Sequence, residues 1–563
     1  MNATKRLLVC LLAAALLFVL LPRGGRAAPE EPPEGWTGIY TREDLEKITY
    51  SPNGQFILMN DLDLSEASFK PLCSEDLPFT GVLDGNGHSV YGLTVTSEKG
   101  AAGLFSYVTG GSIRSLSVSG SVTAPVAGIV AGNVTDGTLS DVTAAGSVTA
   151  TFCGGGVVGQ SGGEKTSLSK CTSSVSLSGT VTGKTELFLG GVVGAVYGKG
   201  TEISSSEFKG SLTAKGPYLS VGGILGAAEG TAVVTSCGNE GTLSLSATDT
   251  SCAGGIVGRG GSKGLTISGC SFRADWSVSG SSALIRMGGI CGLLSAEVGS
   301  SVSDCITYGS LTYEGTAAYV GGTVGHVIAG AGSASVQRCA STAKITGEGS
   351  PLFLGGIVGM NLSVSSQALV EDCYGAGVIA HTGDIVDITG TVHSYGFGGI
   401  AGHNGGYAVS TLRRCFSLYS FDLINTVAEG AVVGTCYHYS DSAEISVENC
   451  FYRDGEVEFF ALPVSGAALS DTESYETFDF EKVWVMNLLT GLPALKIADG
   501  LITTSPAGDV DGNGLITAYD ARLLGLFLTD EADLSQLQRT RADINGDGVL
   551  NARDMALILL ASR

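Results

Sequence analysis

Two twelve-residue segments carry oxygen-bearing side chains at the same spacing. Residues 509–520 and 543–554 each place such side chains at positions 1, 3 and 5, glycine at 6, an aliphatic residue at 8 and aspartate at 12. Ca²⁺ binds about six to eight oxygens, and glycine at the sixth position lets the chain turn sharply around the ion. Each segment runs into an apolar, helix-favouring stretch, residues 521–528 and 555–561. The spacing therefore predicts two calcium-binding loops.

The surroundings of these loops differ from those of a usual EF-hand, which has a helix on both sides and glutamate at position 12. Residues 503–507 before the first loop are not helix-forming, and both twelfth residues are aspartate. The duplicated loop–helix unit resembles a type I dockerin, the module that docks onto a cohesin domain of a scaffold protein. The resemblance covers roughly residues 508–563. It implies a small all-α domain that holds two Ca²⁺ ions and binds a cohesin in a cellulosome-type complex.

The dockerin resemblance also implies roles for individual residues. Twelve residues would hold calcium, with Leu515 and Val549 contributing backbone carbonyls: Asp509, Asp511, Asn513, Leu515, Thr517, Asp520, Asp543, Asn545, Asp547, Val549, Asn551 and Asp554. The cohesin-reading positions 10 and 11, often Ser-Thr in the family, are here Ala518, Tyr519, Ala552 and Arg553. This departure leaves the choice of cohesin open. The alternative is a calcium-stabilised cap with no partner.

The first residues of the chain predict secretion. Lys5 and Arg6 precede an apolar run at residues 7–21, and small residues follow, so we expect a signal peptide cleaved after Ala27. The rival interpretation, a membrane anchor, requires a longer apolar run. The chain carries a net charge of −23, and removal of residues 1–27 makes it more acidic. Such a charge disfavours nucleic acid and anionic lipid, and makes an anionic polysaccharide a less natural partner unless calcium bridges the two.

A repeated glycine phrase, Gly-Gly-x-x-Gly with mostly aliphatic residues at x, organises the long middle of the chain. The intervals are mostly 32 to 35 residues, with one of 43, and the copies begin at Gly155, Gly190, Gly222, Gly254, Gly288, Gly321, Gly355 and Gly398, with degenerate copies at 127–132 and 430–434. Fifteen to twenty residues later most repeats have an aliphatic residue three positions before a cysteine, at Cys171, Cys237, Cys270, Cys305, Cys339, Cys373, Cys415 and Cys450.

Three short β-rich strands per repeat, separated by Gly, Ser and Asn turns, do not fit a helical solenoid. They predict a parallel β-helix of roughly ten coils stacked about 4.8 Å apart. One inward ladder would contain Val157, Val192, Ile224, Ile256, Ile290, Ile357, Ile400 and Val432. The structural alternative, a β-propeller, needs more residues per repeat. Because the cysteines fall on one regular ladder, we expect mostly reduced, buried thiols instead of a disulfide framework.

The repeats, together with the segments at 55–64 and 79–93 that precede them, resemble the GLUG-repeat family of bacterial surface and secreted proteins. The resemblance covers about residues 36–497, and Phe478, Phe480, Trp484 and residues 491–495 resemble the segment that closes such domains. It implies a right-handed β-helix used in adhesion or as a scaffold, without agreed catalytic residues. The expected organisation is a signal peptide at 1–27, an N-terminal cap at 28–80, repeats at 81–455, a cap and linker at 456–500 and a dockerin at 501–563. A capping-box pattern, Thr41 with Asp44, predicts a short helix in the first cap.

Several features on the rod could carry chemistry, but each has a structural interpretation. Asp304, Arg338, Asp372 and Arg414 precede successive ladder cysteines, and their alternating signs predict ion pairs between coils. Residues 84–88 (Asp-Gly-Asn-Gly-His) have the composition of a turn. His326 and His403 each follow a glycine phrase, and we expect solvated turn residues. Half or more of the aromatic residues in the last coils are expected to pack inside: Tyr395, Phe397, Tyr407, Phe416, Tyr419, Phe421, Tyr437, Tyr439, Phe451 and Tyr452.

Two functions from different classes remain open. In the preferred hypothesis, a non-catalytic β-helix for adhesion or polysaccharide binding is tethered by the dockerin to a scaffold, and there are no catalytic residues. In the alternative, the β-helix is a polysaccharide lyase or glycoside hydrolase. Fold does not decide between them, because β-helices also serve pectin-degrading enzymes. The long interval between Gly355 and Gly398, with His381, Asp384, Asp387 and His393, is the best place for a catalytic groove.

Overall fold

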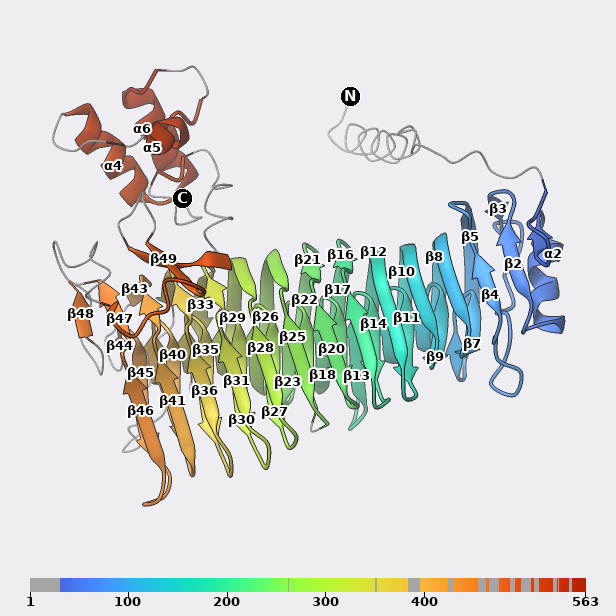
Figure 1. Ribbon diagram of the computed structural model, residues 1–563, viewed down its shortest axis with the longest axis horizontal. Coiled ribbons are helices and arrows are strands. Elements are labelled where there is room, and N and C mark those ends of the chain that lie inside the picture. The colour runs from blue at the N-terminus through green and yellow to red at the C-terminus, as the bar shows by residue number, and fades with distance from the viewer. Residues whose placement is uncertain are drawn as a thin grey trace.

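The computed structural model describes residues 31–261, 263–349, 352–382, 395–423, 429–453, 462–464, 475–486, 492–497, 508–510, 516–529, 534, 536–545 and 549–562. The predicted signal peptide lies outside these residues. The described chain is mainly β, and its strands stack as the coils of a rod (Figure 1).

The chain enters the rod through a short helix and a set of parallel strands. Helix α2 (Arg42–Glu46) begins as predicted, with the Thr41 hydroxyl accepting a hydrogen bond from the Asp44 backbone N–H at 3.3 Å. A 3₁₀ turn (Lys47–Tyr50) follows. The first strands are β1 (Thr37–Ile39), β2 (Gln55–Leu58), β3 (Leu62–Asp63), β4 (Val82–Asp84) and β5 (Ser89–Thr96). Because β1 pairs with β2, and β2 with β4, in parallel, stacking starts at the first strand.

One side of every coil is a strand that follows the glycine phrase. Eleven such strands form one parallel sheet: β7 (Phe105–Thr109), β9 (Ala131–Thr135), β11 (Val158–Gly162), β14 (Val193–Val196), β19 (Leu225–Ala228), β24 (Val257–Gly260), β27 (Cys291–Ala296), β30 (Val324–Ala329), β35 (Val358–Ser363), β40 (Ala401–Gly406) and β45 (Val433–His438). The rod therefore has about eleven turns against the ten predicted. The additional turn contains β7, which follows Ala102-Gly103-Leu104 and lacks the double glycine.

The rest of each coil belongs to a second, larger sheet. In one coil this sheet includes the short strand β6 (Ala101–Ala102). In other coils it includes long continuous strands: β8 (Ser112–Gly128), β10 (Thr138–Gly155), β12 (Thr166–Thr180), β26 (Ser271–Gly288) and β29 (Ile306–Gly321). Elsewhere the path is divided at corners into shorter strands: β13 (Glu186–Gly190), β15 (Thr201–Ser204), β16 (Glu207–Phe208), β17 (Ser211–Gly216), β18 (Tyr218–Gly222), β20 (Ala232–Thr235), β21 (Gly238–Asn239), β22 (Thr242–Ala247), β23 (Ser251–Gly254), β25 (Leu265–Ser268), β28 (Ser300–Ser303), β31 (Ala334–Gln337), β32 (Ala340–Ser341), β33 (Lys344–Glu348), β34 (Leu352–Gly355), β36 (Ala368–Glu371), β37 (Tyr374–Gly375), β38 (Val378–His381), β39 (Tyr395–Gly398), β41 (Val409–Arg413), β42 (Phe416–Ser417), β43 (Ser420–Leu423), β44 (Glu429–Gly430), β46 (Glu444–Glu448), β47 (Phe451–Arg453) and β48 (Leu462–Val464).

Successive coils pair in parallel and in register. Val193 of β14 pairs with Leu225 of β19, which pairs with Val257 of β24. This arrangement excludes the propeller alternative, since propeller blades are antiparallel sheets. The fold is therefore the predicted parallel β-solenoid.

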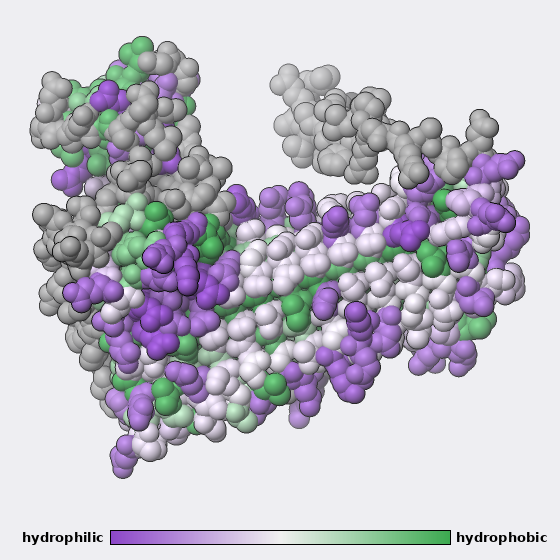
Figure 2. Space-filling model, viewed as in Figure 1, coloured by the Kyte–Doolittle hydropathy of each residue, from purple (hydrophilic) through white to green (hydrophobic). Residues whose placement is uncertain are grey.

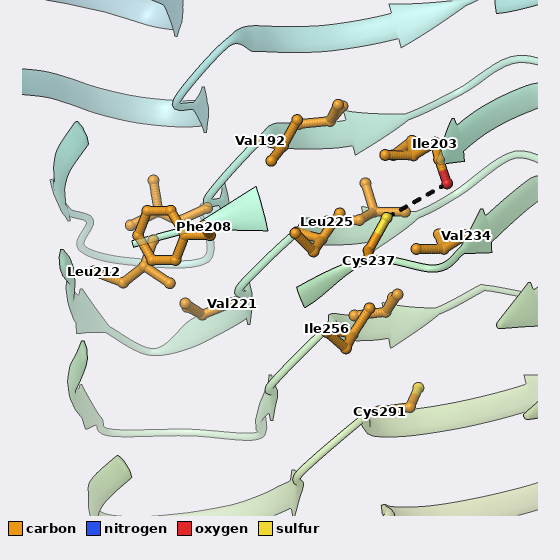
Figure 3. Close-up of a cluster of buried hydrophobic side chains, with 14 of the residues drawn as sticks. Val192, Ile203, Phe208, Leu212, Val221, Leu225, Val234, Cys237, Ile256 and Cys291 are labelled. Atoms are coloured by element: carbon orange, nitrogen blue, oxygen red, sulfur yellow. Dashed lines mark hydrogen bonds between the residues drawn. The ribbon is translucent and has the colours of Figure 1, made fainter. Parts of the chain in front are cut away.

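The interior is filled by the predicted aliphatic ladder, whose eight members are all fully buried. Figure 3 shows Val192 and Ile256 of this ladder beside Phe208 and Cys237 from other sides of the coil. Thr323 takes the position between Ile290 and Ile357, where its backbone carbonyl accepts from Ile290 at 2.9 Å. Stacking of identical positions thus builds one continuous core, as predicted.

The cysteines are buried, as predicted. The described residues contain thirteen free cysteines, of which Cys436 alone is partly exposed. The backbone N–H of Cys237 approaches the Cys270 sulfur at 3.4 Å, and that of Cys270 approaches Cys305 at the same distance. Ser206 fills the ladder position between Cys171 and Cys237, because the Cys171 N–H donates to its hydroxyl at 3.1 Å. Burial raises the pKa of the Cys171 thiol to about 12, so this thiol stays protonated.

A left-handed corner precedes the cysteine ladder in every coil. Lys170, Ser205, Ser236, Asp304, Arg338, Asp372, Arg414 and Asn449 all have φ between 49° and 56°. A β-branched residue at such φ values is disfavoured, and these positions hold none. The residues of alternating charge, Asp304, Arg338, Asp372 and Arg414, therefore lie at the corners of successive coils.

A segment formed by residues 475–486 and 492–497 lies on the flank of the last coils. Its strands β49 (Trp484–Met486) and β50 (Pro493–Leu495) pair antiparallel. Tyr475, Phe478 and Trp484 pack onto an outward column of the coils that contains Ile306, Ala340, Tyr374, Phe416 and Phe451. Figure 1 shows β49 beside the last turns of the rod. We call the residues 475–486 and 492–497 the flank segment.

Candidate functional site

Three helices form the region that contains the predicted calcium loops: α4 (Ala518–Leu528), α5 (Gln536–Ala542) and α6 (Ala552–Ala561). Helices α4 and α6 confirm the predicted helical stretches, while α5 was not predicted. Val510, Ala521, Leu524, Leu534, Ala542 and Ile558 form their common core. Gly508 lies close to α5, because its N–H donates to the Arg541 carbonyl at 2.7 Å.

The two predicted loops end in matching helix starts. Thr517 and Asn551 are the N-caps of α4 and α6, and each helix has a capping box completed by Asp520 or Asp554. One Asp520 carboxylate oxygen accepts from the Thr517 backbone at 2.7 Å and from its hydroxyl at 2.9 Å. One Asp554 oxygen accepts from the Asn551 backbone at 3.1 Å. The twelfth residue of each loop therefore holds the loop end against the helix.

The residues present fit a calcium ion at the second loop. Asp554 is fully buried, and its other carboxylate oxygen has no hydrogen-bond partner in the described part of the chain. A buried, unpaired carboxylate oxygen is costly unless a cation lies against it. Asp509 and Asp520 of the first loop are also fully buried. Carboxylate and amide oxygens at this spacing are the ligands that Ca²⁺ prefers.

The other predicted ligands are placed less completely. The Asn551 side chain donates to the Val549 carbonyl at 2.9 Å and accepts from the Arg553 N–H at 2.8 Å. Asp511, Asn513, Leu515 and Asp547 lie outside the described residues. Within the described part, no three His, Cys, Asp or Glu side chains converge on a possible metal position.

The four predicted cohesin-reading residues occupy equivalent surface positions. Ala518 and Tyr519 open α4, Ala552 and Arg553 open α6, and all four are exposed. The structure adds an apolar surface that the sequence analysis missed: Leu559 and Leu560 of α6 are 41% and 63% exposed. The sequence indicates this exposed apolar surface, because the run Met555–Ala561 has more apolar residues than one buried helix face requires.

The charges on the rod are paired, as the alternating signs predicted. Arg338 contacts Asp304 through two hydrogen bonds of 2.7 and 2.8 Å, and Arg414 contacts Asp372 through two of 2.9 and 3.0 Å. Glu371 accepts from Arg413 at 2.5 Å and also contacts Arg414. We call these six residues the charge ladder. Its carboxylates neutralise neighbouring cations.

Burial alone would raise the pKa of Glu371, but hydrogen bonds from Arg413 and Gln337 and the charge of Arg414 lower it below its ordinary value. The pKa of Asp304 is lowered in the same way, since hydrogen bonds from Arg338 and Ser303 outweigh burial. Both groups are therefore ionised at neutral pH. A general acid needs the opposite shift.

The expectation that His326 and His403 are solvated turn residues is wrong. Both are buried, on β30 and β40. Neighbouring backbone segments approach each other closely at the glycine phrases. A Cβ at Gly325, for example, would lie 2.6 Å from the backbone nitrogen of Met287. His326 thus packs on Tyr319 at 4.9 Å, and His403 on Phe353 at 5.1 Å. Burial, together with the charge of Arg286, lowers the pKa of His326, so its imidazole is neutral.

The predicted turn at 84–88 is confirmed. The Asp84 carboxylate accepts from the Asn86 backbone at 2.8 Å, Asn86 has φ 52°, and His88 contacts Asp61 at 3.2 Å. In the long interval after Gly355, His381 is buried on β38, and burial lowers its pKa. Asp384, Asp387 and His393 lie outside the described residues.

The aromatic residues of the last coils divide as predicted. Tyr395, Phe397, Phe416, Tyr419, Phe451 and Tyr452 are buried, whereas Tyr407 and Tyr437 are 52% and 38% exposed. A separate cleft of about 330 Å³ lies between the charge ladder and the flank segment, lined by Asp304, Arg338, Lys482, Val483, Leu495, Lys496 and Ile497. Figure 2 shows that the visible flank of the rod is mostly of intermediate hydropathy, interrupted by several groups of hydrophilic residues.

Helices of the described chain are too short or too polar to cross a membrane. Residues 507–559 match the type I dockerin domain family. No curated protein matches the sequence. Among solved structures, the chain is similar to a protein from Bacteroides ovatus proposed to be an immunoglobulin A1 protease. The identity is 16%, the TM-score is 0.35, and the match covers 52% of this chain and 79% of that chain. A TM-score this low supports no functional argument.

The family match agrees in position with the duplicated loops and with the matching capping boxes of α4 and α6. A dockerin implies docking onto a cohesin in a cellulosome-type assembly, and dockerin-bearing proteins are typically extracellular. Residues 507–559 are therefore a type I dockerin domain, which follows a parallel β-solenoid in this chain.

Proposed function

We propose that this protein is secreted, docks through its dockerin onto a cohesin of a scaffold protein, and presents the β-solenoid as a non-catalytic rod for polysaccharide binding or adhesion. The observation that carries the proposal is the dockerin match over paired helices whose first residues are exposed. In this proposal Ala518, Tyr519, Ala552 and Arg553, together with Leu559 and Leu560, contact the cohesin.

Two calcium ions would be held by the twelve residues named from the sequence. The unpaired, buried oxygen of Asp554 supports this at the second loop. Calcium would neutralise the clustered carboxylates, and in this way allow the two loops to fold against α4 and α6.

The charge ladder supports a non-catalytic role for the late coils, where it lies, because its six members neutralise one another. Acid–base chemistry on a polysaccharide needs carboxyl groups whose pKa values are pushed apart, one of them upward. Glu371 and Asp304 are both shifted downward. The alternative, a lyase or hydrolase, would place its site at the long interval after Gly355.

Docking is tested with the full chain and cohesin domains in a pull-down with calcium, with a chelator, and with the variant Asp554→Ala. Loss of binding on chelation and in the variant is expected, while Glu207→Gln on the solenoid serves as the control. Circular dichroism should show loss of helical signal on chelation and an unchanged β signal. Retention of cohesin binding without calcium would contradict the proposal.

The role of the rod is tested by incubating the full chain with plant and host polysaccharides. Retention and released sugars are measured on the same samples. Retention without new reducing ends or unsaturated products supports the binding rod. Product release would favour the enzyme alternative and direct mutagenesis to residues 381–393.

A further inference from the structure

Three tyrosines meet on the outer surface of the last coils. Tyr407 follows β40, Tyr437 lies in β45, and Tyr439 follows β45 in the next coil. The Tyr407 and Tyr439 rings stack with centroids 5.3 Å apart and an interplanar angle of 26°. Tyr437 meets Tyr439 edge-on at 4.8 Å. We call these three residues the tyrosine platform.

The platform is held in place from below by a buried histidine. His403 Nε2 lies 3.2 Å from the Tyr439 hydroxyl, and its Nδ1 lies 2.7 Å from the Thr435 hydroxyl. Gly405 leaves room for this contact, because a Cβ there would lie 2.6 Å from His403 Nε2 and 3.2 Å from the Tyr439 ring. These contacts therefore hold the Tyr439 ring in place, and the rings of Tyr407 and Tyr437 pack against it.

Four exposed tyrosines nearer the N-terminus do not form such a group. Tyr40, Tyr50 and Tyr91 are at least as exposed as Tyr437 but contact no other described ring. Tyr197 contacts only the buried Phe188, at 6.5 Å. Isolated exposed apolar residues are ordinary, whereas a contiguous, fixed group indicates a binding surface.

The chemistry of the platform and its surroundings identifies a class of ligand. Aromatic faces suit the apolar C–H faces of sugar rings, and the nearby hydroxyls suit their polar edges. The Ser440 hydroxyl lies 3.1 Å from both the Tyr407 carbonyl and the Ser442 hydroxyl. The loop carries Asp441, which is exposed, and the chain has a net charge of −23, so an anionic polymer would be repelled.

We propose that the tyrosine platform binds a neutral polysaccharide by stacking its rings against successive sugar residues. This inference rests on the proposed function, in which the solenoid binds polysaccharide, and assigns that binding to a site. Three rings are too small an area for a stable protein–protein interface, which buries about 1,200 Å² or more. A surface of this size suits a polysaccharide chain that is held at a few stacked sugars.

The test is affinity electrophoresis of the full chain in gels that contain xylan, mixed-linkage β-glucan, galactomannan or polygalacturonate. The variants are Tyr407→Ala and Tyr437→Ala, with Tyr407→Phe to preserve the stacking face. Tyr197→Ala is the matched control, since that tyrosine is 44% exposed and lies several coils away. Thermal unfolding of each variant confirms that the rod is intact.

Retardation by at least one neutral polysaccharide is expected, with the affinity reduced about tenfold in each alanine variant. Tyr407→Phe and Tyr197→Ala should behave as the unmodified chain. Neutral-polysaccharide binding that survives both alanine variants would overturn the platform and leave the proposed function standing. Retardation by polygalacturonate alone, dependent on Lys482 and Lys496, would also overturn it, in favour of the cleft beside the flank segment. Absence of any retardation would overturn the platform and the polysaccharide-binding part of the proposed function, and would leave cohesin docking to its own test.

Discussion

One column of outward-facing residues, which pair in register from coil to coil, forms a polar surface in the first coils and part of a hydrophobic core in the last. Ser117, Thr143 and Thr172 begin the column, and Tyr374, Phe416 and Phe451 end it, joined by parallel register through every intervening coil. The backbone is equivalent at both ends. The flank segment covers the last part only, because only there do apolar side chains point outward. The stacked backbone therefore supports either surface, and side chains decide which one forms.

Contacts between coils differ in the same way along the rod. In the early coils exposed hydroxyls face each other, as in Ser147–Ser121 at 3.0 Å and Thr149–Ser178 at 3.2 Å, beside a single half-buried ion pair of Arg114 with Asp84 at 2.8 Å among the described residues of β4, β8, β10 and β12. In the late coils the charge ladder joins successive corners through buried or half-buried ion pairs. Exposed hydroxyl pairs contribute little to stability, whereas a buried charge without its partner is costly. The late coils should therefore be the part of the rod that is sensitive to single substitutions.

The largest expected effect is at Phe416, which is fully buried between Tyr374 and Tyr475. Phe416→Ala should lower the free energy of unfolding of the last coils by about 3–5 kcal/mol, because it leaves a cavity beneath the flank segment. Thr143→Ala, in the same column, should change it by less than about 0.5 kcal/mol. Urea unfolding and the rate of proteolysis within 475–497 measure the difference. Equal effects at the two sites would show that the column is uniform.

Removal of one cation from the charge ladder should have the next largest effect. Arg414→Ala leaves the buried Asp372 without its cation and removes one of the two arginines at the buried Glu371, and should cost about 2 kcal/mol, between the values for exposed and buried pairs. Lys199→Ala removes the exposed pair with Glu164 and should have no measurable effect. Thermal unfolding of the two variants compares them. A silent Arg414→Ala would mean that the ladder does not hold the late coils together.

Acid should weaken the late coils before the early ones. Because the folded-state pKa values of Asp304 and Glu371 lie below their ordinary values, their contribution is complete above about pH 5 and is lost as the pH falls through the lowered pKa values. Hydrogen exchange at pH 6 and pH 3, corrected for the intrinsic rate, should show reduced protection of β36 and β41 but not of β10 and β12. Uniform protection at pH 3 would contradict this.

The smallest effect is expected at the exposed hydroxyls of the early coils. Thr149→Val removes a hydroxyl that lies 3.2 Å from Ser178 and should change the free energy of unfolding by no more than about 0.5 kcal/mol. A loss above about 1 kcal/mol would show that hydroxyl pairs stabilise the coils as the ion pairs do, and would remove the contrast between the two regions.

Much of the fold could be predicted because a stacked coil repeats its own sequence. The glycine phrase and the cysteines three residues after an aliphatic residue identify positions that must superpose, and the same place in each phrase assigns Val157, Val192 and Ile224 to one inward ladder. The alternating signs of Asp304, Arg338, Asp372 and Arg414 predicted their pairing for the same reason. The dockerin could be recognised from the local spacing of its two loops alone, and the family match over residues 507–559 confirms it. The eleventh turn was missed because the coil with β7 lacks the double glycine.

Tertiary structure decided what covers each outward side chain. Alternation assigns a residue to a face, but burial of that face depends on a second segment or on the angle between two strands. His326 and His403 are buried because the strands beside the glycine phrase close on each other. Phe416 is buried because residues more than fifty positions later return to the flank, whereas Tyr407 and Tyr437 stay exposed because no described segment covers them. Sequence alone specified the coil, since its contacts repeat at a fixed interval. The candidate binding surface emerged only from contacts that do not repeat.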